Sequence, residues 1–247
     1  MTSIEKWKAE LAAKAKPEKI KVFVNFFKTG KGEYGEGDKF IGLSVPDNRA
    51  VAKTKWASGY YEIAEMLESE IHEHRLSALL CLVEKYRKLK KDRTAREELI
   101  GFYLDHAKRA NNWDLVDLSA PYTIGEWCVE NSDFSTLYRL SESANLWEQR
   151  IAIVATVTAI RKGIFSPTIS IAEKYLSHPH ELIHKATGWM LREMGKRDIT
   201  ELRNFLDRHA DSMPRTALRY AIERMDEAER KHYLAFKTKK NAENTEK

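Results

Sequence analysis

Hydrophobic residues recur along most of the chain at the three- and four-residue spacing of amphipathic helices, and the alternation typical of strands is hard to find. Proline, glycine and asparagine interrupt this pattern at short intervals, which favours short connections between antiparallel helices. The sequence therefore predicts an all-α protein. Its expected helices cover residues 4–14, 18–28, 47–56, 59–69, 71–90, 94–109, 113–119, 121–130, 133–142, 146–162, 168–177, 180–195, 198–209, 214–223 and 226–235.

Four of these segments share a pattern in which a basic residue near the helix start is followed by apolar residues on one face. Three of the basic residues, Arg150, Lys185 and Arg215, are spaced as expected for helical-pair repeats of the HEAT or armadillo type. We therefore predict one domain over residues 1–236, a curved α-solenoid of HEAT-like antiparallel helix pairs. Basic residues on its inner face would suit the phosphates of a DNA duplex.

Two stretches depart from the helical pattern. Residues 29–46 (TGKGEYGEGDKFIGLSVP) are rich in glycine and have no period, so we expect a glycine-rich surface loop, and loops of this length are often functional. The glycine spacing matches no Walker pattern and follows no strand, which argues against a nucleotide-binding loop. Residues 237–247 are polar and predict a disordered tail.

Composition is that of a protein with a sizeable core and a solvated surface, because 43% of residues are hydrophobic and 32% are charged. The net charge of +5 is compatible with a polyanionic partner. Cys81 and Cys128 lie in apolar stretches and are expected to be buried, reduced thiols. The N-terminus lacks a signal-peptide pattern, and the longest apolar run, Ile151 to Ile160, is too short to span a membrane. We expect a cytoplasmic protein with no membrane partner.

Three segments carry candidate chemistry. In the first, Asn112 is a good helix N-cap, and Trp113 and Asp117 are four residues apart on one helix face. In the second, Arg150 opens an otherwise apolar helix, where it either reaches solvent or is held for an anion. In the third, Trp189 belongs to an apolar helix stripe. Taken singly, the tryptophans are typical core residues and the aspartate is typical of a cap or an ion pair.

Together and in this order, the segments WDLVD (113–117), WEQRIAI (147–153) and KATGWMLRE (185–193) resemble the DNA alkylation repair family, the AlkD-like glycosylases built of HEAT-like repeats. The resemblance runs from about residue 44 to about residue 223. It implies that Asp117 is the catalytic carboxylate and that Trp113 and Trp189 form aromatic walls of the lesion cleft. It also implies that Arg150 and Arg192 contact the DNA.

The chemistry implied by this resemblance needs few groups. A purine alkylated at N3 or N7 is cationic and leaves as a neutral base, so no general acid is required. One carboxylate stabilises the oxocarbenium-like sugar and positions a water molecule, and indole rings attract the cationic base. The resemblance implies a monofunctional alkylpurine DNA glycosylase, a hydrolase of base excision repair that captures its lesion within the stack of double-stranded DNA. We expect a DNA-associated monomer with no cofactor and no metal.

The sequence also departs from the family and leaves alternatives open. The glycine-rich segment looks like an insertion, and Phe26 and Phe27 occupy a region where some members have a tyrosine.

A non-catalytic HEAT-like module that binds DNA or a protein is the main alternative. Histidines at 72–74 and 178–184 suggest a metal site, but HExxH spacing is absent and Pro179 disfavours a compact ligand face.

Overall fold

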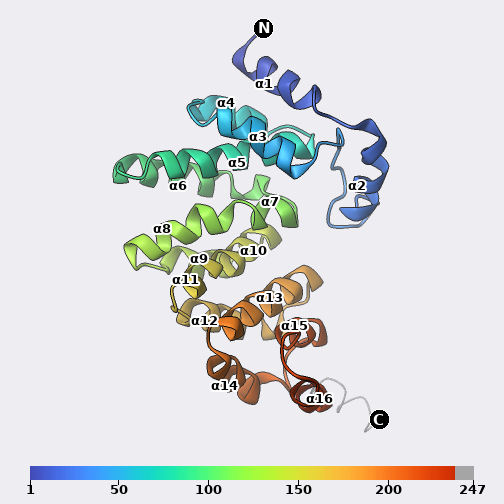
Figure 1. Cartoon of the computed structure of the whole chain (residues 1–247), viewed down its shortest axis with the longest axis vertical. Helices are drawn as coiled ribbons and strands as arrows, with labels where there is room; N and C mark the ends of the chain where they lie inside the picture. Colours follow the sequence, from blue (N-terminus) through green and yellow to red (C-terminus); the bar gives the residue numbers. More distant parts are fainter. Residues whose placement is uncertain (237–247) are drawn as a thin grey trace. The chain divides into compact units, whose positions relative to one another are not determined.

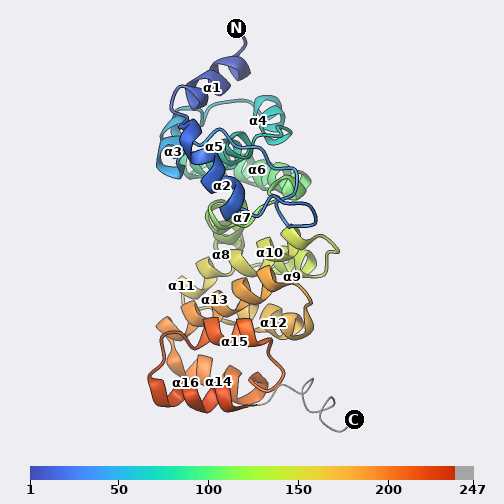
Figure 2. The same cartoon turned by 90° about the vertical axis from the view of Figure 1, so that its right-hand side faces the viewer.

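A computed structural model describes residues 1–236 of the chain, so the predicted tail at 237–247 lies outside the described residues. The chain divides after Thr123 into two compact units (Figures 1 and 2). Within the described residues the regular elements are helices, with one isolated bridge between Lys39 and Ile71 and no strand, which confirms the all-α prediction. No helix in this part of the chain is long and apolar enough to cross a membrane. The prediction of a single domain stays a prediction.

The first unit is organised around α5 (His72–Lys88), which packs against α3, α4, α6 and α7. Its first twelve residues are all buried, including the apolar run from Leu79 to Val83. Trp7 of α1 reaches this helix and donates from Nε1 to Ser77 Oγ at 2.9 Å. The other elements of this unit are α1 (Ser3–Ala12), η1 (Pro17–Lys19), α2 (Ile20–Phe26), α3 (Val45–Thr54), α4 (Tyr60–Leu67), α6 (Arg93–Asp105), η2 (Ala107–Arg109), α7 (Trp113–Asp117) and η3 (Ala120–Tyr122).

The second unit is organised around α13 (Glu181–Arg197), which packs against α10, α14 and α15. Gly188 allows α15 to approach α13 closely, since a Cβ atom there would lie 2.3 Å from the backbone oxygen of Ala217. The other elements are α8 (Ile124–Asn131), α9 (Ser135–Ser141), α10 (Leu146–Ala155), α11 (Val157–Arg161), α12 (Ser166–Lys174), η4 (Tyr175–Ser177), α14 (Ile199–His209), α15 (Arg215–Ala221) and α16 (Glu227–Ala235).

Most predicted helices are present within a few residues of their expected ends, and two differences have a local cause. The helix expected over 146–162 is interrupted at Thr156, whose hydroxyl donates to the Ile153 oxygen at 2.7 Å and so competes with the backbone bonds of the helix. Helix α3 begins at Val45, earlier than predicted, because Ser44 caps it by accepting from the Asp47 N–H.

Both cysteines are buried free thiols, as the sequence predicts. Burial raises the pKa of Cys81 and of Cys128 to about 12, so both remain protonated at neutral pH. Cys81 donates to the backbone oxygen of Lys55 at 3.1 Å. These thiols contribute to packing in the two units.

Candidate active site

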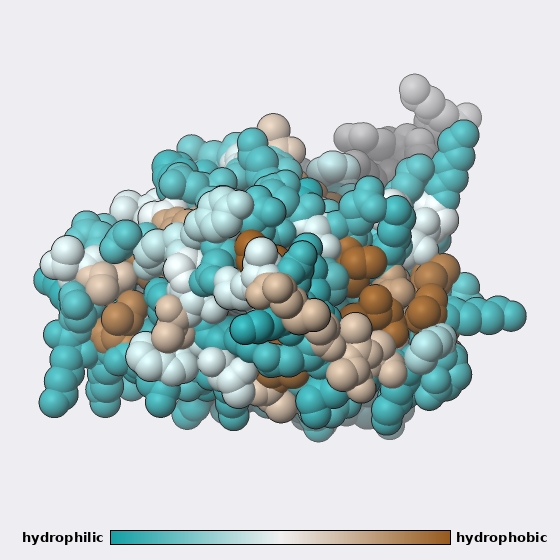
Figure 3. Space-filling model, turned by 90° about the horizontal axis from the view of Figure 1, so that it is seen from above, coloured by the Kyte–Doolittle hydropathy of each residue, from teal (hydrophilic) through white to brown (hydrophobic). Residues whose placement is uncertain are grey.

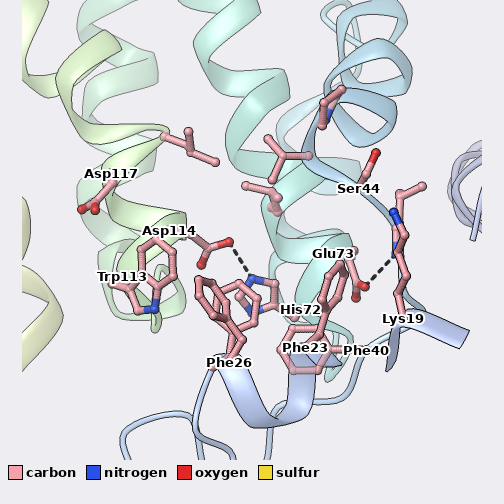
Figure 4. A pocket seen from close by; sticks show the side chains of 16 residues that line it. Lys19, Phe23, Phe26, Phe40, Ser44, His72, Glu73, Trp113, Asp114 and Asp117 are labelled. Atoms are coloured by element: carbon pink, nitrogen blue, oxygen red, sulfur yellow. Dashed lines mark hydrogen bonds and ion pairs between the residues drawn. The ribbon is translucent and has the colours of Figure 1, made fainter. Parts of the chain in front are cut away.

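The short helix α7 brings the first two predicted site residues together. Asn112 caps it, because its Oδ1 accepts the backbone N–H of Trp113 at 2.8 Å. Trp113 and Asp117, one helical turn apart, are both partly exposed, and both line a pocket of about 450 Å³ in the first unit (Figure 4). The shared face predicted from their spacing is therefore present.

Phenylalanine rings line the pocket next to Trp113. Phe27 stacks on Trp113 with ring centres 5.4 Å apart and an interplanar angle of 24°, and Phe26 meets the same indole edge-on at 5.5 Å. Phe26 is 60% exposed and stands at the rim, whereas Phe27 is buried. The pocket is thus an aromatic site that acidic side chains of α5 and α7 also line. Its lining residues are Lys19, Phe23, Phe26, Phe27, Phe40, Leu43, Ser44, Val45, Pro46, His72, Glu73, Leu76, Trp113, Asp114, Asp117 and Leu118.

A buried polar network borders the pocket. His72, only 2% exposed, donates from Nε2 to Asp114 Oδ2 at 2.9 Å and from Nδ1 to Asp38 Oδ2 at 3.0 Å. Arg75 forms an ion pair with Asp38, and Asn112 Nδ2 donates to the same carboxylate at 3.1 Å. The cap of α7 and its first-turn aspartate are therefore both tied to this network.

Electrostatics in this network favour ionised side chains. Burial by itself lowers the pKa of His72, but Asp114 and Asp38 outweigh it and raise that pKa to about 9. Burial similarly works to raise the pKa of Asp38, yet the hydrogen bond and charge of His72, with the charge of Arg75, hold it below the ordinary value. The rings of Phe27 and Phe40 each lie 4.8 Å from the imidazole, and these rings further favour the cation.

The glycine-rich segment has no helix from residue 29 to residue 44, as the sequence predicts for a loop, and hydrogen bonds from its backbone anchor its second half. Glu73 accepts the backbone N–H groups of Ile41, Gly42 and Leu43 at 2.8 to 3.1 Å. Gly42 has a φ of +81°, and a Cβ atom there would lie 2.1 Å from the Lys16 oxygen, so only glycine fits. Phe40 and residues 43–46 of this stretch line the pocket.

The sequence pattern did not indicate that Asp38, Phe40, His72 and Asp114 belong to the site. The available signal was the run of polar residues that opens the apolar helix α5, which suggested a metal site. The two histidines of that run differ: burial, with the charges of Lys8 and Arg75, lowers the pKa of His74 to about 4. Across residues 1–236, no group of three or more potential metal-binding side chains is clustered to hold an ion.

Comparison with known proteins agrees with these observations. A family model described as "DNA alkylation repair enzyme" matches residues 7–225. The chain belongs to the DNA alkylation repair enzyme family. It is thus a DNA repair protein, with DNA as its substrate.

A solved structure, described as a predicted DNA alkylation repair enzyme from Enterococcus faecalis, is similar to this family member in fold. The TM-score is 0.66 and the sequence identity is 14%, with 87% of this chain and 98% of the other chain covered. At this identity the likeness shows the all-helical fold alone. No curated protein sequence matches this chain significantly.

The remaining predicted site residues of this DNA alkylation repair protein lie in the second unit. Arg150 is only 5% exposed and donates from Nη1 to the backbone oxygen of Leu182 at 2.8 Å, so it does not extend to solvent as one interpretation of the sequence held. Trp189 on α13 is partly exposed. Arg192, also on α13, forms an ion pair with Glu223. The contribution of these three residues to the site at α7 stays a prediction.

Proposed function

We propose that this protein is a monofunctional DNA glycosylase that hydrolyses the N-glycosidic bond of purines alkylated at N3 or N7 in double-stranded DNA. The observation that carries the proposal is the pairing of Trp113 with Asp117 on one face of α7, at the edge of a ring-lined pocket. In this proposal the enzyme acts as a monomer in base excision repair.

Asp117 is the carboxylate that the proposed reaction uses. It stabilises the positive charge that develops on the sugar as the bond breaks, and it orients the water that attacks the anomeric carbon. Trp113 is partly exposed and Phe26 is exposed, and such rings attract a cationic base by about 0.5–2 kcal/mol. The cationic purine leaves as a neutral molecule, so no acid is needed at the base.

The second unit supplies further contacts in this proposal. Trp189 forms a second aromatic wall for the lesion. Arg150 and Arg192 bind the DNA backbone, as guanidinium groups pair well with phosphate. Arg150 is fixed in place by its hydrogen bond to Leu182, which limits the conformational freedom that DNA binding would cost.

The distribution of charge supports a polyanionic substrate near the pocket. Residues 14–31 contain six lysines and one glutamate, so this segment has a formal charge of +5, equal to that of the whole chain. The segment includes α2, which also provides Phe23 and Phe26 to the pocket. A concentrated positive charge of this kind favours binding to the phosphates of DNA.

Base release from DNA treated with a methylating agent tests this function. The freed purines are separated by chromatography after incubation with the protein. We expect release of 7-methylguanine and 3-methyladenine, no release from untreated DNA, and no strand cleavage. Tight DNA binding without release of either base would contradict the proposal and favour a non-catalytic DNA-binding module.

A further inference from the structure

The pocket in the first unit is suited in size and wall chemistry to a small planar ligand. Its volume of about 450 Å³ falls within the range of small-molecule sites. Aromatic rings form much of its wall, and such rings favour flat heteroaromatic ligands by stacking and edge contacts. In Figure 3, apolar side chains gather on the side of the surface where Figure 1 places α2. Phe26 of this helix lines the pocket and is exposed.

Three acidic side chains border the pocket, and they differ in how their oxygens are used. Glu73 is occupied by the three backbone N–H groups of residues 41–43. Asp117 has an interaction of its own. Asp114 is different: the residue is only 4% exposed, its Oδ2 accepts from His72, and its Oδ1 is buried with no hydrogen-bond partner among the described residues.

A buried carboxylate oxygen without a partner is costly, so it is a strong acceptor for a ligand. Figure 4 shows this second oxygen of Asp114 turned toward Trp113 and Phe26, inside the pocket. His72 and Arg75 form ion pairs with Asp114 and Asp38, and the second oxygen of the Asp114 carboxylate is left as a hydrogen-bond acceptor. A ligand that fits must therefore combine a flat ring with an N–H donor.

We propose that this pocket binds a free alkylpurine base, with the ring against Trp113 and the phenylalanines and an exocyclic amino group donating to Asp114 Oδ1. This inference rests on the proposed function, since such a base is the product of that reaction. It gives the enzyme a product-binding site beside Asp117, and it makes Asp114 a specificity residue for purines that carry an amino group.

Direct binding to the full-length protein tests the inference without DNA. Isothermal titration calorimetry with 3-methyladenine is compared with its N6,N6-dimethyl analogue, which keeps the ring but has no N–H donor. We expect 3-methyladenine to bind about 10-fold to 100-fold more tightly than the analogue, as expected for one hydrogen bond to a charged group. Equal affinities, or no binding of 3-methyladenine, would overturn the inference.

The variant Asp114→Asn tests the acceptor itself. Its amide oxygen would face the His72 N–H, which leaves the NH₂ group facing the pocket and opposed to the donor of the ligand. We expect 3-methyladenine to bind about 10-fold to 100-fold more weakly, with little change for the analogue. Wild-type affinity in a folded Asp114→Asn protein would contradict the assignment.

A second variant covers the case in which Asp114→Asn does not fold. Phe26→Ala removes an exposed ring from the rim and should leave the core intact. We expect it to weaken the binding of both ligands, and unchanged affinity for both would overturn the placement of the ring. Base release measured on the same preparation separates the two proposals: release without base binding defeats only this inference, and base binding without release defeats only the proposed glycosylase.

Discussion

Trp113 and Asp117 lie one turn apart on α7, and both side chains border the same pocket in the first unit. The helix that carries them has only five residues, so its own hydrogen bonds do little to fix its position. Its placement comes from buried polar contacts at its start, where Asn112 binds Asp38 and Asp114 binds His72. The candidate catalytic pair is thus held by residues of the glycine-rich segment and of α5.

This arrangement predicts a pH dependence of stability. The pKa of His72 is raised from 6.5 to about 9 in the folded protein, so its stabilising contribution is complete below pH 6.5 and is lost as the pH rises through 9. The shift corresponds to a loss of roughly 3 kcal/mol in the free energy of unfolding. Urea denaturation at pH 6.5, 8 and 9.5 measures it. The His72→Gln variant should be less stable at pH 6.5 and should lack this slope, and parallel slopes for both proteins would disprove the role of His72.

The lysines around α2 are expected to provide much of the salt-dependent binding to DNA. Replacing the exposed Lys21 and Lys28 by alanine should weaken binding to undamaged duplex and reduce the slope of log K against log salt by up to about 2. Lys90→Ala with Lys91→Ala is the matched control, because these lysines follow the far end of α5, about 24 Å along the helix from the pocket. Equal effects of the two pairs would argue against a DNA contact at α2.

Arg150 is expected to serve both stability and DNA binding. Its burial and its bond to Leu182 mean that Arg150→Ala should lower the free energy of unfolding by about 1.5–3 kcal/mol, in addition to weakening DNA binding. Chemical denaturation and binding titrations at several salt concentrations measure the two effects. A variant that loses stability but keeps the wild-type binding constant and salt slope would make Arg150 a purely structural residue.

Two substitutions of Trp189 distinguish its role in core packing from its role in aromatic contact with the lesion. Trp189→Phe retains a ring and should change stability little, whereas Trp189→Ala costs up to about 3–5 kcal/mol. We expect the Phe variant to excise cationic adducts more slowly, because indole is the better partner for a cation. Wild-type excision rates for Trp189→Phe, measured at single turnover, would show that the indole serves packing alone.

The parts that sequence predicts well are local. Helical periodicity located nearly all the helices, and the i, i+4 spacing placed Trp113 and Asp117 on one face. The contacts it missed join residues far apart in the chain: His72 is 34 residues from Asp38 and 42 from Asp114. A periodic pattern carries no information about which helix ends meet. The glycine-rich segment has no period at all, and Glu73 determines its path from another element.

The central claim is that Asp117 performs the excision chemistry, and Asp117→Asn isolates it by removing the charge while keeping the shape. An amide does not balance the charge of an oxocarbenium-like sugar, so the rate should fall by about 10²–10³, equivalent to ~2.7–4 kcal/mol. Slow residual release should persist because the cationic lesion also departs unaided. Asp105→Asn, at the exposed end of α6, is the control and should behave as wild type.

The most direct measurement is single-turnover excision from a duplex containing one 7-methylguanine, paired with binding to an abasic-site analogue. For Asp117→Asn we predict a loss of excision by two to three orders of magnitude, with affinity for the analogue unchanged or slightly higher because a carboxylate that repels phosphate has been removed. Excision by Asp117→Asn at the wild-type rate would contradict the assignment of Asp117 as the catalytic carboxylate.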